Sequence, residues 1–409
     1  MPGGTLSTLD NVLKEHYVGP IRRQVNDSMV ITREVKRNPA VMTGGQQVTI
    51  PVGYGGTGGT GARAEGGTLP SATNQSFEQI VLNMAYNYGR MQISGPAIKA
   101  SRSNTFAFTK GLRAEMDGLV RDIKKSVNRQ WYNPSTGAIA DAVSGHASTG
   151  VLTLESTHES GERIANMNRF WEGMVIDIVT DAAGADVYAD QTISVIDRSA
   201  RTVTCSTSNI SNTADTDYVV IADTANGTGT YEILGLMAWV GSTTNTIGTI
   251  DRSDGNDEWF RPNVLDNSGS LRALSLDLMR QSVDEADERS GGQIDMAITS
   301  HAVRRKYEAL VRADRRHVNT MKLDGGSKGL EYDGFPIIVD SHCDLNLIYF
   351  LEKGDLGIYE MGDFDWMDED GAILNRVANT DAYEGTMTWY SQFCVHTPPK
   401  HTMLDDITT

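Results

Sequence analysis

The chain has 409 residues, of which 39% are hydrophobic and 22% charged, and it carries a net charge of −17. A chain of this length can form two or three domains with buried cores, and its composition is ordinary for a globular protein. The acidic balance disfavours generic binding to nucleic acid through a basic surface, because neutralising phosphates requires clustered lysines and arginines.

The cysteines and the lack of targeting signals indicate in which compartment the protein is made. Cys205, Cys343 and Cys394 are far apart and form no CxxC pair, which argues against a disulfide framework or a thiolate zinc site. The N-terminus lacks the layout of a signal peptide, and the longest apolar run, residues 233–240, is too short to span a bilayer. We therefore expect a soluble protein made in a cytosol, with no contact to a membrane.

The first elements in chain order are short. Residues 1–26 mix a brief helical pattern with glycine and proline, which predicts an extended arm carrying one short helix. Residues 27–35 have a β-like pattern, and Asn38-Pro39 predicts a bend.

A glycine-rich segment follows. Residues 44–67 contain ten glycines and no lysine, and strand-like patterns precede and follow them. This predicts a long β-arm with its tip at residues 53–70, returning along a long strand that Gly95-Pro96 ends. A two-stranded hairpin is marginal alone in water, so we expect a neighbouring copy of the chain to hold the tip through Tyr54, Arg63 and Glu65.

Residues 103–132 predict one long amphipathic helix. Apolar side chains recur at steps of three and four residues, Ser103 or Asn104 can cap its start, and Asn133-Pro134 ends it. At 1.5 Å per residue such a helix is about 40 Å long, which is typical of a spine on which sheets pack.

Residues 146–225 differ sharply in composition from their surroundings. They are rich in Thr, Ser, Ala and Asp, and short strand signals fall at 150–155, 173–179, 191–197, 201–206 and 217–222. No helical pattern interrupts them, so we predict an inserted all-β module of barrel or sandwich type.

The remainder predicts an α+β domain. An amphipathic helix spans residues 271–286 and ends at Gly291-Gly292, and a strand at 294–299 leads to a second helix, 301–313, capped by Ser300. Hairpin turns are predicted at Asp333-Gly334 and Asp370-Gly371. A long strand at 386–395 precedes a tail that we expect to be irregular.

The sequence contains stretches that resemble cofactor and metal motifs, but the residues around them do not match the surroundings that such sites require. Two G-x-G-x-x-G matches lie in the arm with no helix behind them, and the acidic run 362–371 lacks the ligand spacing of a calcium loop. The eight histidines are scattered, and no G-x-S-x-G elbow exists. We expect no catalytic residue, no bound cofactor and no metal site.

One basic cluster stands out in this acidic chain. It could face solvent or DNA, but we favour contact with an acidic patch on another copy, since charge complementarity sets register and specificity. Its members are Arg304, Arg305, Lys306, Arg312, Arg315, Arg316 and His317.

The order of these parts resembles the major capsid protein of tailed bacteriophages, which has the Hong Kong 97-like fold. The stretches that carry the resemblance are YEILGLMAWV (231–240), YDGFPIIVDSHCDLNLIYFLEKGDLGIYEMGDFDW (332–366) and YEGTMTWYSQFCVHTP (383–398).

The resemblance implies an α+β capsid fold divided as follows: 1–26, N-terminal arm; 27–102, extended β-loop and peripheral-domain strand; 103–145, spine helix of the peripheral domain; 146–225, inserted module; 226–380, axial domain; 381–409, C-terminal peripheral-domain strand and tail. It also implies self-assembly of hexamers and pentamers in the host cytoplasm into an icosahedral virion shell. The shell would enclose double-stranded DNA without sequence-specific binding, with scaffolding, portal and decoration proteins as further partners.

This chain departs from some family members in two respects, its lysines and its lack of a long N-terminal scaffolding segment, so we expect scaffolding to be a separate protein or already removed. Two other classes of protein stay open. Some family members crosslink subunits through a loop lysine, but no lysine lies between Lys36 and Lys99, so we expect non-covalent contacts. An encapsulin compartment shares the fold, although encapsulins are usually shorter and lack such an insertion. A hydrolase with a β accessory module would need a catalytic constellation that the sequence does not display.

Overall fold

The computed structural model describes residues 30–39, 47–96, 105–143, 150–155, 164–180, 186–207, 210–215, 217–225, 230–243, 245–253, 255–313, 320–322, 328–362, 365–367 and 375–409. Several predictions fall outside these ranges: the N-terminal arm, the cap residues Ser103 and Asn104, the basic residues Arg315, Arg316 and His317, and the Asp370-Gly371 turn.

A seven-stranded sheet forms the centre of one half of the molecule, and two helices pack on one of its faces. Helix α6 lies against β24 and β14, and helix α7 lies against β18. The elements in sheet order are β14 (Asn263–Leu265), β24 (Thr402–Leu404), β19 (Ile348–Leu351), β15 (Met296–Thr299), β18 (Phe335–Val339), β17 (Lys328–Tyr332) and β16 (Thr320–Lys322), with α6 at Leu276–Ser290 and α7 at His301–Ala313.

Local signals in the sequence define the ends of these elements. The Ser275 side chain accepts a hydrogen bond from Leu278 N at 3.1 Å, and Gly291 ends α6 in the left-handed region at φ 65°. Asp333 and Gly334, with φ 48° and 87°, form the turn between β17 and β18. The predicted second helix and this turn are confirmed, and the first helix begins a few residues later than expected.

A second, elongated sheet packs against helix α4 (Thr105–Gln130), which confirms the predicted long helix. Gly89 on β4 faces Ile123 and Leu119 of α4 so closely that a Cβ atom there would overlap the Ile123 side chain. The strands are β1 (Lys36–Pro39), β4 (Ala85–Ser94), β20 (Leu356–Glu360), β21 (Asp365–Trp366), β22 (Asn375–Arg376) and β23 (Ala382–Val395), of which β23 pairs with β4, β20, β21 and β22.

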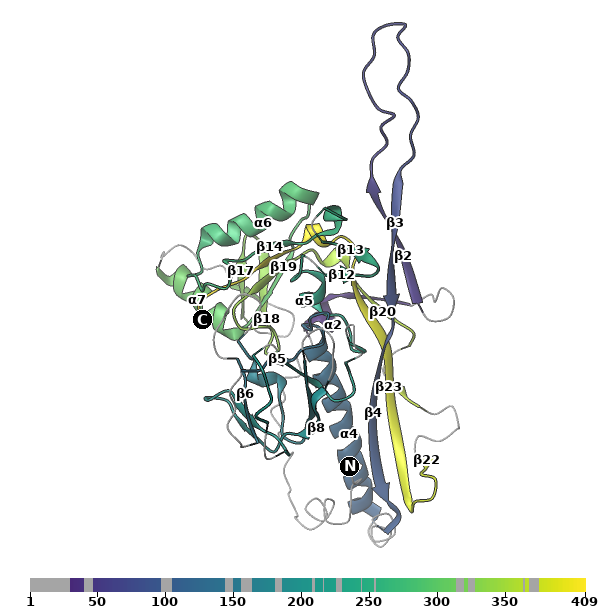
Figure 1. Ribbon diagram of the computed structural model, residues 1–409, viewed down its shortest axis with the longest axis vertical. Helices are drawn as coiled ribbons and strands as arrows, with labels where there is room; N and C mark the ends of the chain where they lie inside the picture. Colours follow the sequence, from purple (N-terminus) through teal and green to yellow (C-terminus); the bar gives the residue numbers. More distant parts are fainter. Residues whose placement is uncertain are drawn as a thin grey trace.

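The predicted return strand of the glycine-rich arm is divided between two sheets. Residues Ser76–Asn83 (β3) pair with β2 (Gln47–Gly55), whereas β4 pairs with β23. Met84 lies between β3 and β4 and is buried. The hairpin therefore continues the direction of the elongated sheet and projects far beyond the body of the molecule (Figure 1).

A small β region with its own apolar core lies beside α4. It consists of two sheets, one ordered β5 (Ala140–Asp141), β11 (Tyr218–Ile221), β7 (Val175–Val179) and β8 (Asp186–Thr192), the other β6 (Val151–Thr153), β10 (Thr202–Thr204) and β9 (Val195–Asp197). The five predicted strand signals each overlap an observed strand. A short 3-10 helix, η1 (Met167–Arg169), adds to this core.

The remaining elements join these parts. They are α2 (Val30–Glu34), α5 (Leu236–Trp239), the strand pair β12 (Thr246–Ile247) and β13 (Ile250–Asp251), and the 3-10 helices η2 (Glu258–Phe260), η3 (Lys353–Asp355) and η4 (Pro398–Lys400).

Three local predictions are wrong. Within 27–35 the described residues form helix α2, because a helix buries both Val30 and Ile31 in the main core. Asn38-Pro39 is not a bend but the end of β1, at the edge of its sheet, where a proline costs no ladder hydrogen bond. The tail is not irregular either: Thr402–Leu404 is buried in the seven-stranded sheet between β14 and β19.

Candidate assembly interface

The base of the projecting hairpin is packed into the body. Val48, Ile80 and Leu82 are buried in the main core, and Val81 N donates to Gly248 O at 2.9 Å. Gly248, at φ 57°, lies so near that a Cβ atom would be 2.6 Å from Ile80 Cγ2, so only glycine fits this turn. The hairpin therefore leaves the body from a fixed point.

The distal part of the hairpin has no core. Residues 60–69 are all exposed, and cross-strand support is polar: Thr57 Oγ1 lies 2.9 Å from Thr73 O, and Gly58 N donates to Thr73 Oγ1 at 2.5 Å. Two apolar side chains stand in water, Leu69 at 81% exposure and Phe77 at 70%. A surface of this kind gains free energy when another molecule covers it.

The structure places the three predicted tip contacts differently. Tyr54 is 46% exposed, and its ring stacks on Trp259 of the same chain with centroids 4.8 Å apart. Arg63 is exposed and donates to the carbonyls of Thr68 at 3.1 Å and Ala62 at 2.9 Å. Glu65 is exposed beside them. Arg63 and Glu65 thus lie together at the tip, whereas Tyr54 lies at its base.

The described part of the predicted basic cluster lies on α7. Arg305 and Lys306 are exposed, while Arg304 and Arg312 share one acceptor, Glu308, at 3.4 Å and 3.8 Å. Only one carboxylate therefore balances two guanidinium groups on this helix.

Sequence reasoning missed an aromatic patch on the elongated sheet. Tyr86 and Tyr88 of β4 meet Tyr390 of β23 edge-on, with centroid distances of 5.2 Å and 5.8 Å. The hydrogen bond to Tyr390 and then partial burial raise the pKa of Tyr88 to about 12. The period-two alternation pointed to a strand, but only the pairing of Tyr86 with Tyr390 gathers these rings across two distant segments.

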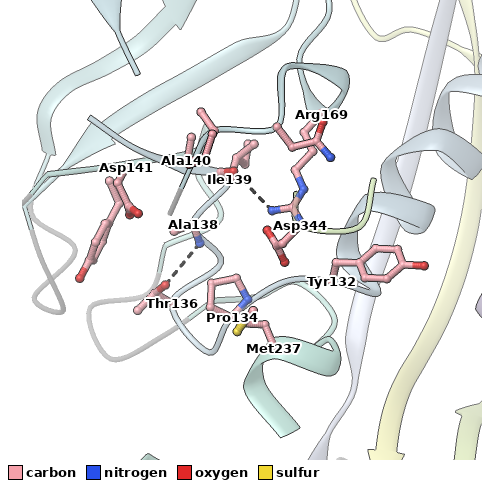
Figure 2. A pocket seen from close by; sticks show the side chains of 14 residues that line it. Tyr132, Pro134, Thr136, Ala138, Ile139, Ala140, Asp141, Arg169, Met237 and Asp344 are labelled. Atoms are coloured by element: carbon pink, nitrogen blue, oxygen red, sulfur yellow. Dashed lines mark hydrogen bonds and ion pairs between the residues drawn. The ribbon is translucent and has the colours of Figure 1, made fainter. Parts of the chain in front are cut away.

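A polar junction joins the small β region to the rest of the chain. Figure 2 shows Arg169 beside Asp344, at the edge of a cavity of about 210 Å³ that Tyr132, Pro134 and Met237 also line. Arg169 Nη2 lies 2.9 Å from Asp344 Oδ1 and 2.8 Å from the carbonyl of His342. With only 4% of its side chain exposed, this guanidinium joins the small β region to the segment between β18 and β19.

Buried histidines and cysteines likewise serve packing. His401 Nε2 lies 3.1 Å from Asp355 Oδ2, while its Nδ1 accepts from Glu352 N at 3.2 Å. All three cysteines are buried and free, and burial raises the pKa of Cys205 to about 11. Among the described residues, no three His, Cys, Asp or Glu side chains gather as metal ligands. Within the same ranges, no helix is both long and apolar enough to cross a membrane.

Comparison with known proteins gives a match at the level of fold. No protein-family model matches the chain, and no curated protein is similar to it in sequence. The capsid subunit of cyanophage A-1(L) matches with a TM-score of 0.54 at 13% identity, over 93% of this chain and 92% of that chain. The chain therefore shares the α+β fold of this capsid subunit.

Two further matches are weaker. The capsid of the native GTA particle matches with a TM-score of 0.44 at 10% identity over 100% of both chains. The holo-SrpI encapsulin complex from Synechococcus elongatus PCC 7942 matches with a TM-score of 0.46 at 7% identity, over 100% of this chain and 96% of that chain. At these scores neither match carries an argument.

Proposed function

We propose that the chain is the major capsid protein of a tailed bacteriophage, a structural subunit with the Hong Kong 97-like architecture. Copies of it would assemble into an icosahedral shell around double-stranded DNA. The observation that carries the proposal is the fold match to a phage capsid subunit over more than nine tenths of both chains. The exposed hairpin supports it, because nothing in the described part of the chain covers Leu69 and Phe77.

The same proposal assigns roles to the parts. The elongated sheet with α4 is the peripheral domain, and the seven-stranded sheet with α6 and α7 is the axial domain. Residues 146–225 are an insertion. Two boundaries change. Residues 140–141 already pair within the small β region, so the proposed insertion begins before residue 146. Residues 402–404 return to the axial sheet, so the proposed C-terminal peripheral segment ends near Val395.

The proposed contacts are non-covalent. The tip would lie across a neighbouring copy, where Leu69 and Phe77 lose water and Arg63 and Glu65 find polar partners. Burying apolar surface gains roughly 25 cal/mol per Å², and such small gains multiply around a closed symmetric shell. The insertion would face outward and meet neighbours or a decoration protein, while the shell itself grips DNA weakly because the chain is acidic.

Electron microscopy of the purified full chain tests the proposal. We expect shells, or rings of five and six subunits, together with elution from size exclusion in the megadalton range or as capsomers. A small monodisperse oligomer would overturn it. Genes for a portal and a terminase beside this one would distinguish a phage shell from an encapsulin compartment.

A further inference from the structure

The outer face of α6 is strongly acidic. The helix carries five carboxylates and two arginines, and a shallow hollow runs along it between Asp277, Arg280, Gln281, Asp284, Glu285 and Glu288. Arg280 is already neutralised by Asp284 at 2.9 Å and by Asp333 at 2.7 Å. Among ion pairs between described residues, no cation meets Asp277, Glu285 or Glu288, and these three carboxylates form a negative stripe.

The outer face of α7, in contrast, is basic. The helix carries four cations and one carboxylate, Glu308, which both Arg304 and Arg312 approach. Arg312 has 80% of its side chain exposed, and Arg305 and Lys306 are exposed beside the small residue Ala309. Among ion pairs between described residues, no carboxylate meets Arg305 or Lys306.

The two helices cover the same face of the seven-stranded sheet without neutralising each other. Met279 of α6 and Val303 of α7 are buried in the same apolar core, so the charged sides of both helices face away from it. Helix α6 lies over β24 and β14, whereas α7 lies over β18 (Figure 1). The negative stripe thus lies toward the β14–β24 edge of this face and the positive stripe toward β18.

We propose that the acidic face of α6 docks against the basic face of α7 in a second copy of this chain. Because the two surfaces differ, the contact is heterologous, and repeating it generates a ring when the rotation closes. The inference rests on the proposed shell function and adds the surfaces that join neighbours around a ring. Opposite charges of this kind set register and reject wrong partners more than they add affinity.

The spacing of the charges suits this contact. Asp277 and Glu285, which lie outside the Arg280–Asp284 pair, are eight residues apart, about 12 Å along a helix axis, and Arg305 and Arg312 are seven apart, about 10.5 Å. Two cations of one helix can therefore reach two carboxylates of the other at once. Ala309, between Arg305 and Arg312, leaves room for the neighbouring helix to approach.

Charge reversal in the full-length chain tests the contact. R305E/K306E makes both faces acidic, and E285K/E288K makes both faces basic. We expect each double variant to form at least tenfold fewer rings than the parent, counted by native mass spectrometry at low ionic strength. The quadruple variant restores them, because its reversed faces are again complementary.

Mixing the two double variants gives a sharper result. Each acidic copy then meets basic copies on both sides, so only rings with an even number of subunits close. The matched control K124E/R376E reverses exposed cations elsewhere and retains the parental distribution of rings.

The outcomes separate the two proposals. Double variants that assemble like the parent, or a quadruple variant that melts like the parent yet assembles no better than either double, would overturn the α6–α7 contact alone. A parent chain that forms neither rings nor shells overturns the proposed function and this contact with it.

Discussion

The projecting hairpin and the seven-stranded sheet obtain their stability in different ways. Every residue of β15 and β19 is buried, whereas residues 60–69 of the hairpin are all exposed. The sheet can fold from its own chain because hydrophobic burial supplies the main driving force. The hairpin tip has almost nothing to bury, so it gains no such stabilisation from its own chain. A region without a core within an otherwise well-packed chain is where we expect contact with a neighbouring copy.

The largest expected effect lies in the sheet. Phe350→Ala removes a fully buried β19 ring from the core that the sheet shares with α6 and α7, and it should lower the free energy of unfolding by about 3–5 kcal/mol. Urea unfolding of the unassembled subunit measures this loss. Leu69→Ala at the tip is the matched control and should change it by less than about 0.5 kcal/mol. Equal effects at both positions would abolish the distinction between the two regions.

The junction of the small β region comes next. Arg169→Met leaves the Asp344 carboxylate buried without its cation and should cost about 3–5 kcal/mol, at the lower end if water enters the adjacent cavity. The double variant with Asp344→Leu should recover part of that loss, because both buried charges are then gone. A double variant that is less stable than Arg169→Met would contradict this account. Thermal unfolding of all three chains provides the comparison.

Acid should lower the free energy of unfolding because it protonates Asp355. Burial by itself raises the pKa of this carboxyl. The hydrogen bond and charge of His401 and the hydrogen bond from the N–H of Thr397 together lower the pKa by more than burial raises it, so the net shift is downward. A lowered pKa in the folded chain means that the stabilisation is present above the unfolded value of 3.8 and is lost as pH falls below it.

The measurement is the free energy of unfolding between pH 2 and 7 for the parent and for Asp355→Asn. The variant should be less stable at pH 7 and should lose less stability on acidification. Glu115→Gln, at an exposed site on α4, should follow the parent curve. A variant curve parallel to the parent would show that Asp355 is not the titrating group.

Substitutions at the tip should reduce assembly and leave the stability of the subunit unchanged. Arg63→Ala and Glu65→Ala should leave subunit unfolding within about 0.5 kcal/mol of the parent, since both side chains are exposed. Shell yield, measured by sedimentation, should fall because the proposed contact loses polar partners. If both variants assemble normally, the side chains of the tip do not carry the contact.

The smallest expected effect concerns covalent bonds. With no lysine between Lys36 and Lys99, assembled particles should dissolve to monomers on a denaturing gel. A ladder of crosslinked species would show that another lysine reaches a neighbour.

Predictions from sequence succeeded where a local signal was sufficient. Apolar residues at three- and four-residue steps located α4, a serine cap and the basic HAVRRKYEALVRA stretch located α7, and the Asp333-Gly334 pair located a hairpin turn. The exposed glycine-rich tip could also be predicted, because its residues cannot form a core whatever surrounds them. The basic face of α7 was visible in the same way.

Predictions failed where distant segments decide the outcome. Residues 402–404 lack any strong strand signal, yet they fill the gap between β14 and β19. Val30 and Ile31 lie in a helix, which lets both side chains be buried in the main core, whereas in a strand they would point to opposite faces. The stacking of Tyr54 on Trp259, more than two hundred residues away in the chain, had no signal in the sequence, and the expected contact of Tyr54 with another subunit stays a prediction.

By itself, the sequence determined most of the elements, the acidic balance and the coreless tip, each of which depends on composition or on periodicity within a short window. The likeness to capsid proteins rested on the order of the parts along the chain. Only the tertiary structure decided that β3 and β4 belong to different sheets, that the tail is a core strand, and that α6 and α7 present opposite charges on one body. Those features depend on long-range pairing and burial, which residue patterns within a single segment do not encode.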